Sequence, residues 1–160
     1  MIFVTIGSMF PFDRLVRAMD AWAATHPEEE VLAQIGDGGF QPSHMRWLRR
    51  LDQDAFAGVA GQAELIVAHA GMGSVITAGQ FGTPIVVLPR LKRRGEHNTD
   101  HQLATAGWLQ GRPGVFVAPA ERELDRRIAE ARAAAAGRLP SLPSVAPPAF
   151  IDRLRAYFES

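Results

Sequence analysis

A stretch near the middle of the chain, residues 64–79, most constrains what this sequence can fold into. Residues 65–68 form a short, wholly apolar run, which is typical of a strand buried on both faces. Gly71 and Gly73 follow closely, and the pattern from Ser74 onwards predicts a helix. Such a turn directs free backbone N–H groups and the positive end of a helix dipole at one point, which suits a phosphate. A tight turn that needs its glycines only for dihedral angles or close packing would give the same pattern.

The same alternation of apolar strands and amphipathic helices runs through most of the chain. We expect strands at residues 2–6, 31–35, 65–68, 85–88 and 115–117, and helices at residues 12–22, 54–62, 74–81, 98–109 and 121–136. Residues 42–51 are expected to be irregular or a short helix, and residues 90–97 a polar loop. This alternation predicts an α/β fold, a Rossmann-like parallel sheet with helices on both faces. Ligands of such folds bind beyond the carboxyl ends of the strands, where four turns are predicted, at Gly7, Gly36, Gly71 and Pro89.

Composition excludes several classes of protein. Lysine plus arginine and aspartate plus glutamate balance at 17 each, so no overall charge draws the chain to nucleic acid or to an acidic membrane. The absence of cysteine excludes disulfides and cysteine metal sites, and it fits a cytoplasmic protein. No apolar run approaches the roughly 20 residues that span a bilayer, so we expect any membrane association to be peripheral.

The sequence divides into three expected segments. Residues 1–136 have a normal size for a single domain. Residues 137–149 are rich in proline, serine and alanine, as in an extended connector. In residues 150–160 aromatic and aliphatic side chains repeat at helical spacing and predict a carboxyl-terminal helix. That helix would pack either on its own domain or on a partner chain.

Five ordered motifs carry a resemblance to a known family. They are FVTIGS at residues 3–8, QIG at 34–36, HAGMGS at 69–74, GTPIVVLPR at 82–90 and GEHNTDHQLA at 95–104. With these motifs the chain resembles the carboxyl-terminal, nucleotide-sugar-binding half of the GT-B glycosyltransferases of family 28, and most closely the PssE-type subunits of bacterial exopolysaccharide transferases. Those subunits are similar in turn to the small cytosolic subunit of the eukaryotic enzyme that adds the second N-acetylglucosamine to dolichol-linked chitobiose.

The resemblance implies a uridine-diphosphate sugar as donor and a transfer that inverts the anomeric centre. It places the donor diphosphate on the two glycine turns, at Gly7, Ser8, His69, Gly71, Met72, Gly73 and Ser74. Ser74 could equally be only the N-cap of its helix, and His69 a histidine satisfied near the core. No paired acidic motif for magnesium is present, so we expect neither a metal nor another cofactor.

The resemblance places the donor sugar on a polar stretch at the start of the helix predicted at residues 98–109, on Glu96, His97, Asp100, His101 and Gln102. Such side chains can donate and accept several hydrogen bonds, as sugar hydroxyls require. The alternatives are ordinary capping of that helix by Thr99 and Asp100, and a solvated turn at the two histidines. A metal is disfavoured because these residues cluster in one stretch without partners at matching spacing elsewhere.

The nucleoside is expected near Gly36, Phe56 and Thr77, with the base placed loosely around residues 51–56. Thr77 stands where many members of the family have an acid for the ribose, and Thr105 where an asparagine often follows the His-Gln pair, so the details of ribose and sugar recognition stay open.

Arg90 begins the one local basic cluster, with Lys92, Arg93 and Arg94. This basic loop could attract the donor phosphates, a lipid-diphosphate acceptor or anionic headgroups, or it could be an ordinary solvated loop.

A GT-B enzyme has two Rossmann-like domains, and this chain has room for one. We therefore expect a donor-binding subunit that works with a membrane-anchored glycosyltransferase subunit. That partner would supply the site for a lipid-linked oligosaccharide acceptor of the undecaprenyl-diphosphate type, the general base, and attachment to the inner face of the plasma membrane. In isolation the chain could form a homodimer.

Two other functions fit parts of the sequence. One is a nucleotide-binding regulatory or scaffold module that activates a partner without binding donor. The other is a dinucleotide-binding oxidoreductase domain, which is disfavoured because the turn at Gly7 lacks the Gly-x-Gly-x-x-Gly spacing and no acid ends the second strand.

Overall fold

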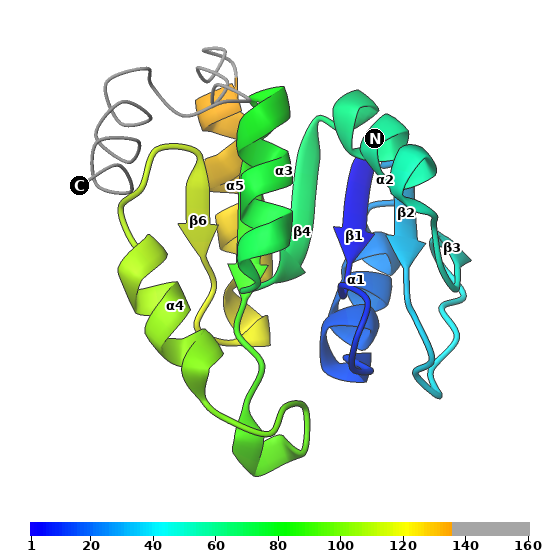
Figure 1. The fold of residues 1–160 in the computed structure, drawn as a ribbon. Helices are drawn as coiled ribbons and strands as arrows, with labels where there is room; N and C mark the ends of the chain where they lie inside the picture. The colour runs from blue at the N-terminus through cyan, green and yellow to red at the C-terminus, as the bar shows by residue number, and fades with distance from the viewer. Residues whose placement is uncertain (136–160) are drawn as a thin grey trace, which may run out of the picture.

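The computed structural model describes residues 1–135, and these form one parallel six-stranded sheet between two layers of helices (Figure 1). The strands are β1 (Ile2–Thr5), β2 (Val31–Gln34), β3 (Arg46–Leu48), β4 (Leu65–His69), β5 (Ile85–Leu88) and β6 (Val115–Val117). The helices are α1 (Asp13–Thr25), α2 (Gln53–Gln62), α3 (Met72–Phe81), α4 (His101–Leu109) and α5 (Leu124–Ala135). Two 3₁₀ turns, η1 (Lys92–Arg94) and η2 (Glu121–Glu123), precede α4 and α5. The expected α/β fold is confirmed.

The order of the strands, β3-β2-β1-β4-β5-β6, places a change of direction at the centre of the sheet. From β1 the chain moves outward through β2 to β3, then returns to the other side of β1 with β4 and moves outward again. β1 therefore pairs with both β2 and β4, and Ile2 lies beside Val31 and Leu65. In open α/β sheets such a switch point leaves a crevice between the loops that follow the two central strands.

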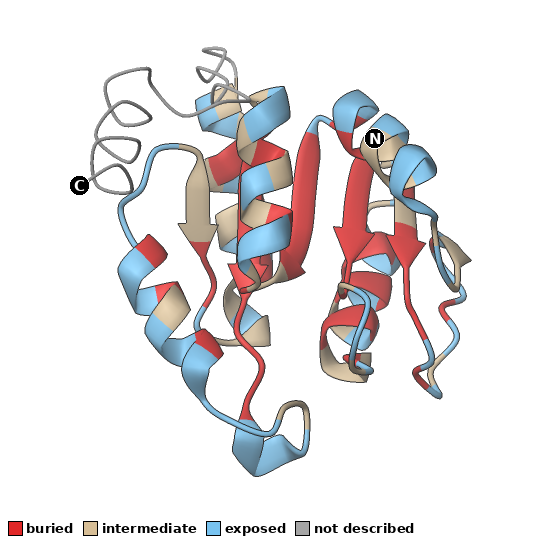
Figure 2. Ribbon diagram, viewed as in Figure 1, coloured by how far each residue is buried: buried red, intermediate tan, exposed pale blue. Residues whose placement is uncertain are grey.

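The side chains of the strands alternate between two cores, one on each face of the sheet. On one face Ile2 and Val4 pack with α1 and α5, including Leu15 and Ile128. On the other face Phe3 packs against α2, α3 and α4, which present small residues: Ala60, Ala78 and Ala106. Every residue of β1 and β5 is buried (Figure 2), as their apolar runs predict. Helices thus cover both faces and leave the carboxyl edge of the strands to the loops.

The sequence prediction of a helix end at Gly82 is confirmed. Gly82 has a φ of 65°, in the left-handed region, and its N–H donates to the carbonyl groups of Ala78 and Gly79. The same stretch then continues into β5, so α3 connects the neighbouring strands β4 and β5 and packs on one face of the sheet.

The structure differs from the sequence prediction mainly in three places, and α3 also begins two residues earlier than predicted, at Met72. Residues 46–48 form the edge strand β3, which escaped prediction because it has only three residues and none of them is buried. α4 begins at His101 instead of residue 98, since the Asp100 carboxylate accepts the N–H of Lys92 and holds the preceding turn against η1. Residues 121–123 form η2 instead of the first turn of α5.

The expected domain boundary at residue 136, the connector at 137–149 and the helix at 150–160 lie outside the described residues. Among residues 1–135, no helix combines the length and the apolar character needed to cross a bilayer.

Candidate functional site

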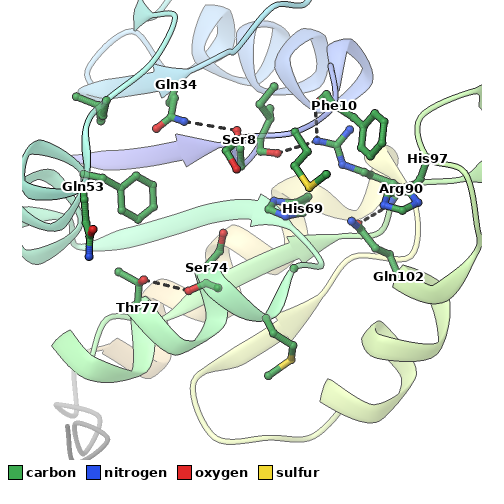
Figure 3. A pocket seen from close by; sticks show the side chains of 18 of the residues that line it. Ser8, Phe10, Gln34, Gln53, His69, Ser74, Thr77, Arg90, His97 and Gln102 are labelled. Atoms are coloured by element: carbon green, nitrogen blue, oxygen red, sulfur yellow. Dashed lines mark hydrogen bonds between the residues drawn. The ribbon is translucent and has the colours of Figure 1, made fainter.

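The loops that follow β1 and β4 border a pocket of about 540 Å³ at the switch point (Figure 3). All seven residues expected at the diphosphate line it: Gly7, Ser8, His69, Gly71, Met72, Gly73 and Ser74. They come from two chain segments separated by some sixty residues of sequence, and the switch point brings them together. The pocket therefore lies where the topology of the sheet predicts a ligand site.

The start of α3 leaves backbone N–H groups available to the pocket. The N-cap of α3 is Gly71, whose carbonyl accepts the N–H of Val75 at 3.3 Å, and no side chain caps the helix. The N–H groups of Met72, Gly73 and Ser74 precede that first hydrogen bond of the helix. They and the helix dipole together favour an anion. Ser74 is the third residue of α3, so the alternative that it is the N-cap is wrong.

His69 is wedged between the two glycine turns. A Cβ on Gly7 would lie 2.6 Å from Cε1 of His69, and a Cβ on Gly71 would lie 2.1 Å from its Nε2. The imidazole thus requires glycine on both sides, whereas a Cβ on Gly73 would meet no atom within 4 Å. Burial, and next the charge of Arg90, lower the pKa of His69 to about 4. At neutral pH the ring is therefore uncharged and can offer an N–H group to an anion without being a cation.

One end of the pocket carries three of the residues expected at the sugar. Gln102 is buried, and its Oε1 accepts the N–H of Arg90 at 3.1 Å, which fixes the direction of the amide group. The rings of His97 and His101 meet edge to face at 4.4 Å, and Phe10 packs edge-on against His97 at 5.0 Å. Burial and the neighbouring His101 lower the pKa of His97. Figure 3 shows Phe10, His97 and Gln102 gathered at this end.

The other two residues expected at the sugar, Glu96 and Asp100, are not part of the pocket lining. The carboxylate of Glu96 accepts from Nε of Arg14 at 2.6 Å and from the N–H of Leu91 at 2.8 Å. The carboxylate of Asp100 accepts the N–H of Lys92 at 2.9 Å. Both acids hold the loop between β5 and α4, because Glu96 fixes it to α1 and Asp100 fixes its second half to η1 within the same loop.

The opposite end of the pocket includes the expected nucleoside residues Phe56 and Thr77. Thr77 donates its hydroxyl to the carbonyl of Gly73 at 3.0 Å. Leu51, Asp52 and Gln53, at the start of α2, complete this end and agree with the loose placement of the base around residues 51–56.

Gly36, the third residue expected at the nucleoside, does not line the pocket. Its φ is 59°, and a Cβ there would lie 2.9 Å from Cδ1 of Ile6. Its carbonyl accepts from the guanidinium of Arg49 at 2.9 Å. Gly36 therefore forms a tight turn after β2, which packs against Ile6 at the start of the loop after β1.

Of the two alternatives for the basic cluster, the solvated loop is wrong for Arg90, which lines the pocket. Only 2% of Arg90 is exposed, and its guanidinium is enclosed by backbone carbonyl groups. The remaining members of the cluster, Lys92, Arg93 and Arg94, are exposed on η1. The difference arises because the guanidinium of Arg90 donates to backbone carbonyl groups of the loop after β1, which hold the side chain inward.

Sequence reasoning missed Met9, Phe10 and Gln34 in the lining of the pocket. Gln34 ends β2, is buried, and has its Nε2 3.5 Å from the carbonyl of Gly7. A polar residue at the end of an otherwise apolar strand was the signal that could have identified it. Met9 and Phe10 gave no such signal, since the position of their side chains depends on the contacts that the loop after β1 makes with distant residues such as Arg90.

The groups placed to touch an anion in the pocket are neutral, while the buried side chain of Arg90 also lines it. Among the described residues no three His, Asp or Glu side chains are placed to hold a metal ion. The groups that face the expected diphosphate are backbone amides, a neutral imidazole and the hydroxyls of two serines. Such preorganised donors stabilise developing negative charge in a site of low dielectric.

A model of the glycosyltransferase family 28 C-terminal domain matches residues 1–112 of this chain. Three solved structures share its fold. The glycosyltransferase of kitacinnamycin superposes with a TM-score of 0.61 at 20% identity, over 99% of this chain and 38% of its own. The glycosyltransferase VinC in complex with dTDP gives a TM-score of 0.53 at 17% identity, over 99% of this chain and 42% of its own. The solution structure of ALG13 gives a TM-score of 0.59 at 20% identity, over 99% of this chain and 96% of its own.

No sequence among curated proteins matches this chain. The chain spans about two-fifths of the length of the first two glycosyltransferases and nearly all of ALG13. At these identities the structural likeness shows a shared fold, while the match over residues 1–112 confirms the resemblance drawn from the five motifs.

Proposed function

Because the chain belongs to the glycosyltransferase family 28 C-terminal domain family, we propose that it is the donor-binding subunit of a two-component inverting glycosyltransferase. The donor is a UDP-sugar, and the acceptor is a lipid-linked oligosaccharide of the undecaprenyl-diphosphate type in exopolysaccharide synthesis. One observation carries the proposal. The uncapped amides at the start of α3 and the turn at Gly7 border the same pocket as His101 and Gln102.

A nucleotide sugar has three parts, and the pocket offers a matching region for each. The diphosphate lies at the start of α3, opposite Gly7 and Ser8, and beside His69. The sugar lies toward Gln102, whose amide is already oriented by Arg90. The nucleoside lies toward Phe56 and the start of α2. A volume of about 540 Å³ falls within the range of roughly 300–1,000 Å³ that small-molecule sites occupy.

The transfer requires stabilisation of the leaving group. The acceptor hydroxyl oxygen forms a bond to the anomeric carbon while the bond from that carbon to the diphosphate oxygen breaks. The electron pair leaves with UDP, and the acceptor proton passes to a general base on the partner subunit. The uncapped amides at the start of α3 stabilise the charge that develops on this oxygen, and in this proposal the transfer needs no metal ion.

The partner supplies what one Rossmann-like domain lacks. The chain spans about two-fifths of the length of the glycosyltransferases that it superposes on, which leaves their other domain unaccounted for. Exposed apolar side chains support an interface at the mouth of the pocket, since Met9 is 81% exposed and Met72 41% exposed. The partner also carries the membrane attachment, which keeps this chain peripheral at the inner face of the plasma membrane.

Calorimetric titration of the purified chain tests donor binding. UDP, UDP-glucose, UDP-glucuronate, UDP-N-acetylglucosamine and dTDP form the panel, with EDTA present in a parallel series. We expect UDP and one UDP-sugar to bind with a Kd between about 1 μM and 1 mM, the usual range of substrate affinities, and EDTA to change nothing. Absence of binding by every nucleotide would favour the regulatory or scaffold module instead.

Reconstitution tests the division of labour. Transfer of sugar from the preferred UDP-sugar to a lipid-linked acceptor is measured with the chain alone, the membrane subunit alone and the two together. We expect activity only from the mixture. Full activity of the isolated chain would contradict the two-component assignment while leaving donor binding intact.

A further inference from the structure

Arg90 has the largest fully buried side chain in the described part of the molecule. It follows Pro89, directly after β5. It lines the donor pocket, although only 2% of the residue is exposed to solvent. Burial of a charged side chain is costly unless its donors are all engaged, so the partners of this guanidinium show what it does.

The guanidinium of Arg90 joins the loop after β1 to the loop between β5 and α4. Its Nη2 donates to the carbonyls of Ile6 and Phe10, each at 2.7 Å. Its Nη1 donates to the carbonyls of Pro11 at 2.5 Å and Glu96 at 3.2 Å. Three of these four acceptors belong to the loop after β1 that carries Gly7 and Ser8. The side chain of Arg90 therefore fixes the loop after β1 at the border of the pocket.

Two further contacts complete the attachment. The guanidinium lies over the ring of Phe12, 4.6 Å from the ring centre, at the start of α1. The backbone N–H of Arg90 donates to Oε1 of Gln102 at 3.1 Å. The same residue thus orients the diphosphate loop with its side chain and the sugar end of the pocket with its main chain (Figure 3).

The charge of Arg90 is not neutralised by a hydrogen-bonded carboxylate among the described residues. All four of its side-chain acceptors are carbonyl groups, and the carboxylate of nearby Glu96 is bound by Arg14 and by the N–H of Leu91. Burial lowers the pKa of Arg90 to about 10, so the side chain stays charged at neutral pH. The field of this charge reaches the pocket, since it helps to lower the pKa of His69.

We propose that Arg90 is a positioning residue of the diphosphate subsite, which holds the Gly7–Ser8 loop against the start of α3 and supplies a fixed positive charge that a bound diphosphate balances. This inference rests on the proposed function, because it needs a nucleoside diphosphate as ligand. Arg90 acts through the loop and through its field, while the amides of α3 and the loop itself touch the ligand.

Binding of uridine, UMP and UDP to the wild type and to Arg90→Met tests this role. If Arg90 acts through its charge and through the phosphate-binding loop, its loss should lower the affinity more for each phosphate that the ligand carries. General loosening of the fold would instead lower the affinity for all three ligands alike. We expect Arg90→Met to bind UDP at least about tenfold more weakly, since a full charge within several ångströms is worth more than that at an effective dielectric of about 20. Binding of uridine should change less than threefold.

Arg49→Met is the matched control. Arg49 also donates to two loop carbonyls, those of Gly36 and Gly38, and lies over an aromatic ring, that of Trp47, but it does not line the pocket. Its removal should lower the melting temperature and leave the ratio of UDP to uridine affinity unchanged.

Arg90→Lys serves where Arg90→Met does not fold. It keeps the charge but cannot reach both loops with a planar fork, so we expect an intermediate ratio of UDP to uridine affinity. An unchanged ratio in Arg90→Lys, or an equal loss of all three ligands in Arg90→Met, overturns the inference. A wild type that binds none of the ligands refutes the proposed function itself.

Discussion

Replacing Gly73 with aspartate should stabilise the fold and weaken donor binding at the same time. Gly73 is the second residue of α3, and a Cβ built on it meets no atom within 4 Å. An aspartate therefore fits without strain. In the first turn of a helix its charge is favourable by about 0.3–1 kcal/mol, and removing a glycine from a helix adds a few tenths of a kcal/mol. The free energy of unfolding should rise by roughly 0.5–1 kcal/mol.

The same carboxylate occupies the site proposed for the diphosphate. It would compete for the amides of Met72 and Ser74 and repel the ligand. Two unit charges about 5 Å apart at an effective dielectric of about 20 interact by roughly 3 kcal/mol, which corresponds to about a hundredfold in Kd. Calorimetric titration with UDP and urea denaturation of the same preparations measure the two effects separately.

Two controls isolate the charge at this position. Gly73→Asn has nearly the same shape without the charge, so it should lose much less affinity for UDP than Gly73→Asp. Gly58→Asp adds the same charge in α2, where a Cβ also meets no atom within 4 Å and the residue does not line the pocket, and it should bind UDP as the wild type does. If Gly73→Asp gains stability yet binds UDP with unchanged affinity, the start of α3 is not the diphosphate site.

Three further perturbations have expected outcomes that solution measurements can check. The folded-state pKa of His69, about 4, lies below its unfolded value of 6.5, so the unfolded chain binds the proton first and stability should fall as pH drops from 6.5 to 4. This loss reaches up to roughly 3 kcal/mol, and urea denaturation across that range should show a shallower slope for His69→Gln. Arg14→Met should destabilise the fold by about 1–3 kcal/mol, because it leaves the half-buried carboxylate of Glu96 with the N–H of Leu91 but without its charged partner at 2.6 Å; the double variant with Glu96→Gln should lose less than the sum in the same assay. Gln102→Leu should weaken binding of the preferred UDP-sugar by about tenfold, the loss of one or two hydrogen bonds, without changing the Kd of UDP.

The sheet and its glycine turns could be predicted because they depend on local patterns. Apolar runs predicted five of the six strands, since a strand that is covered on both faces of the sheet consists almost entirely of apolar residues. The turn residues Gly7, Gly71 and Gly73 were found for the same reason, as each directly follows a predicted strand. β3 could not be found in this way, because an exposed edge strand of three residues carries no periodic signal.

The side chains of the polar stretch before α4 could not be assigned from the sequence, since their directions depend on distant partners. Glu96 is drawn away from the pocket by Arg14, which lies 82 residues earlier on α1. Arg90 is drawn inward by carbonyl groups of the loop after β1, about 80 residues earlier. In both cases the sequence supplied a polar residue in the right loop, and only the fold decided whether it faces the ligand, the core or another charge.

The glycines of the site have different physical reasons to be glycine. Gly7 and Gly71 are required by the imidazole of His69, which would lie within 2.6 Å and 2.1 Å of any Cβ at those positions. Close packing, one of the two explanations that the sequence left open, therefore accounts for Gly71, and both explanations apply to Gly7, whose φ of 76° lies in the left-handed region. Gly73 faces open space, so packing does not explain it; under the proposed function, the approach of the diphosphate to the backbone is its reason to be glycine. Because the ring of His69 lies between the loop at Gly7 and the turn at Gly71, it limits how closely the two turns of the proposed diphosphate site can approach each other.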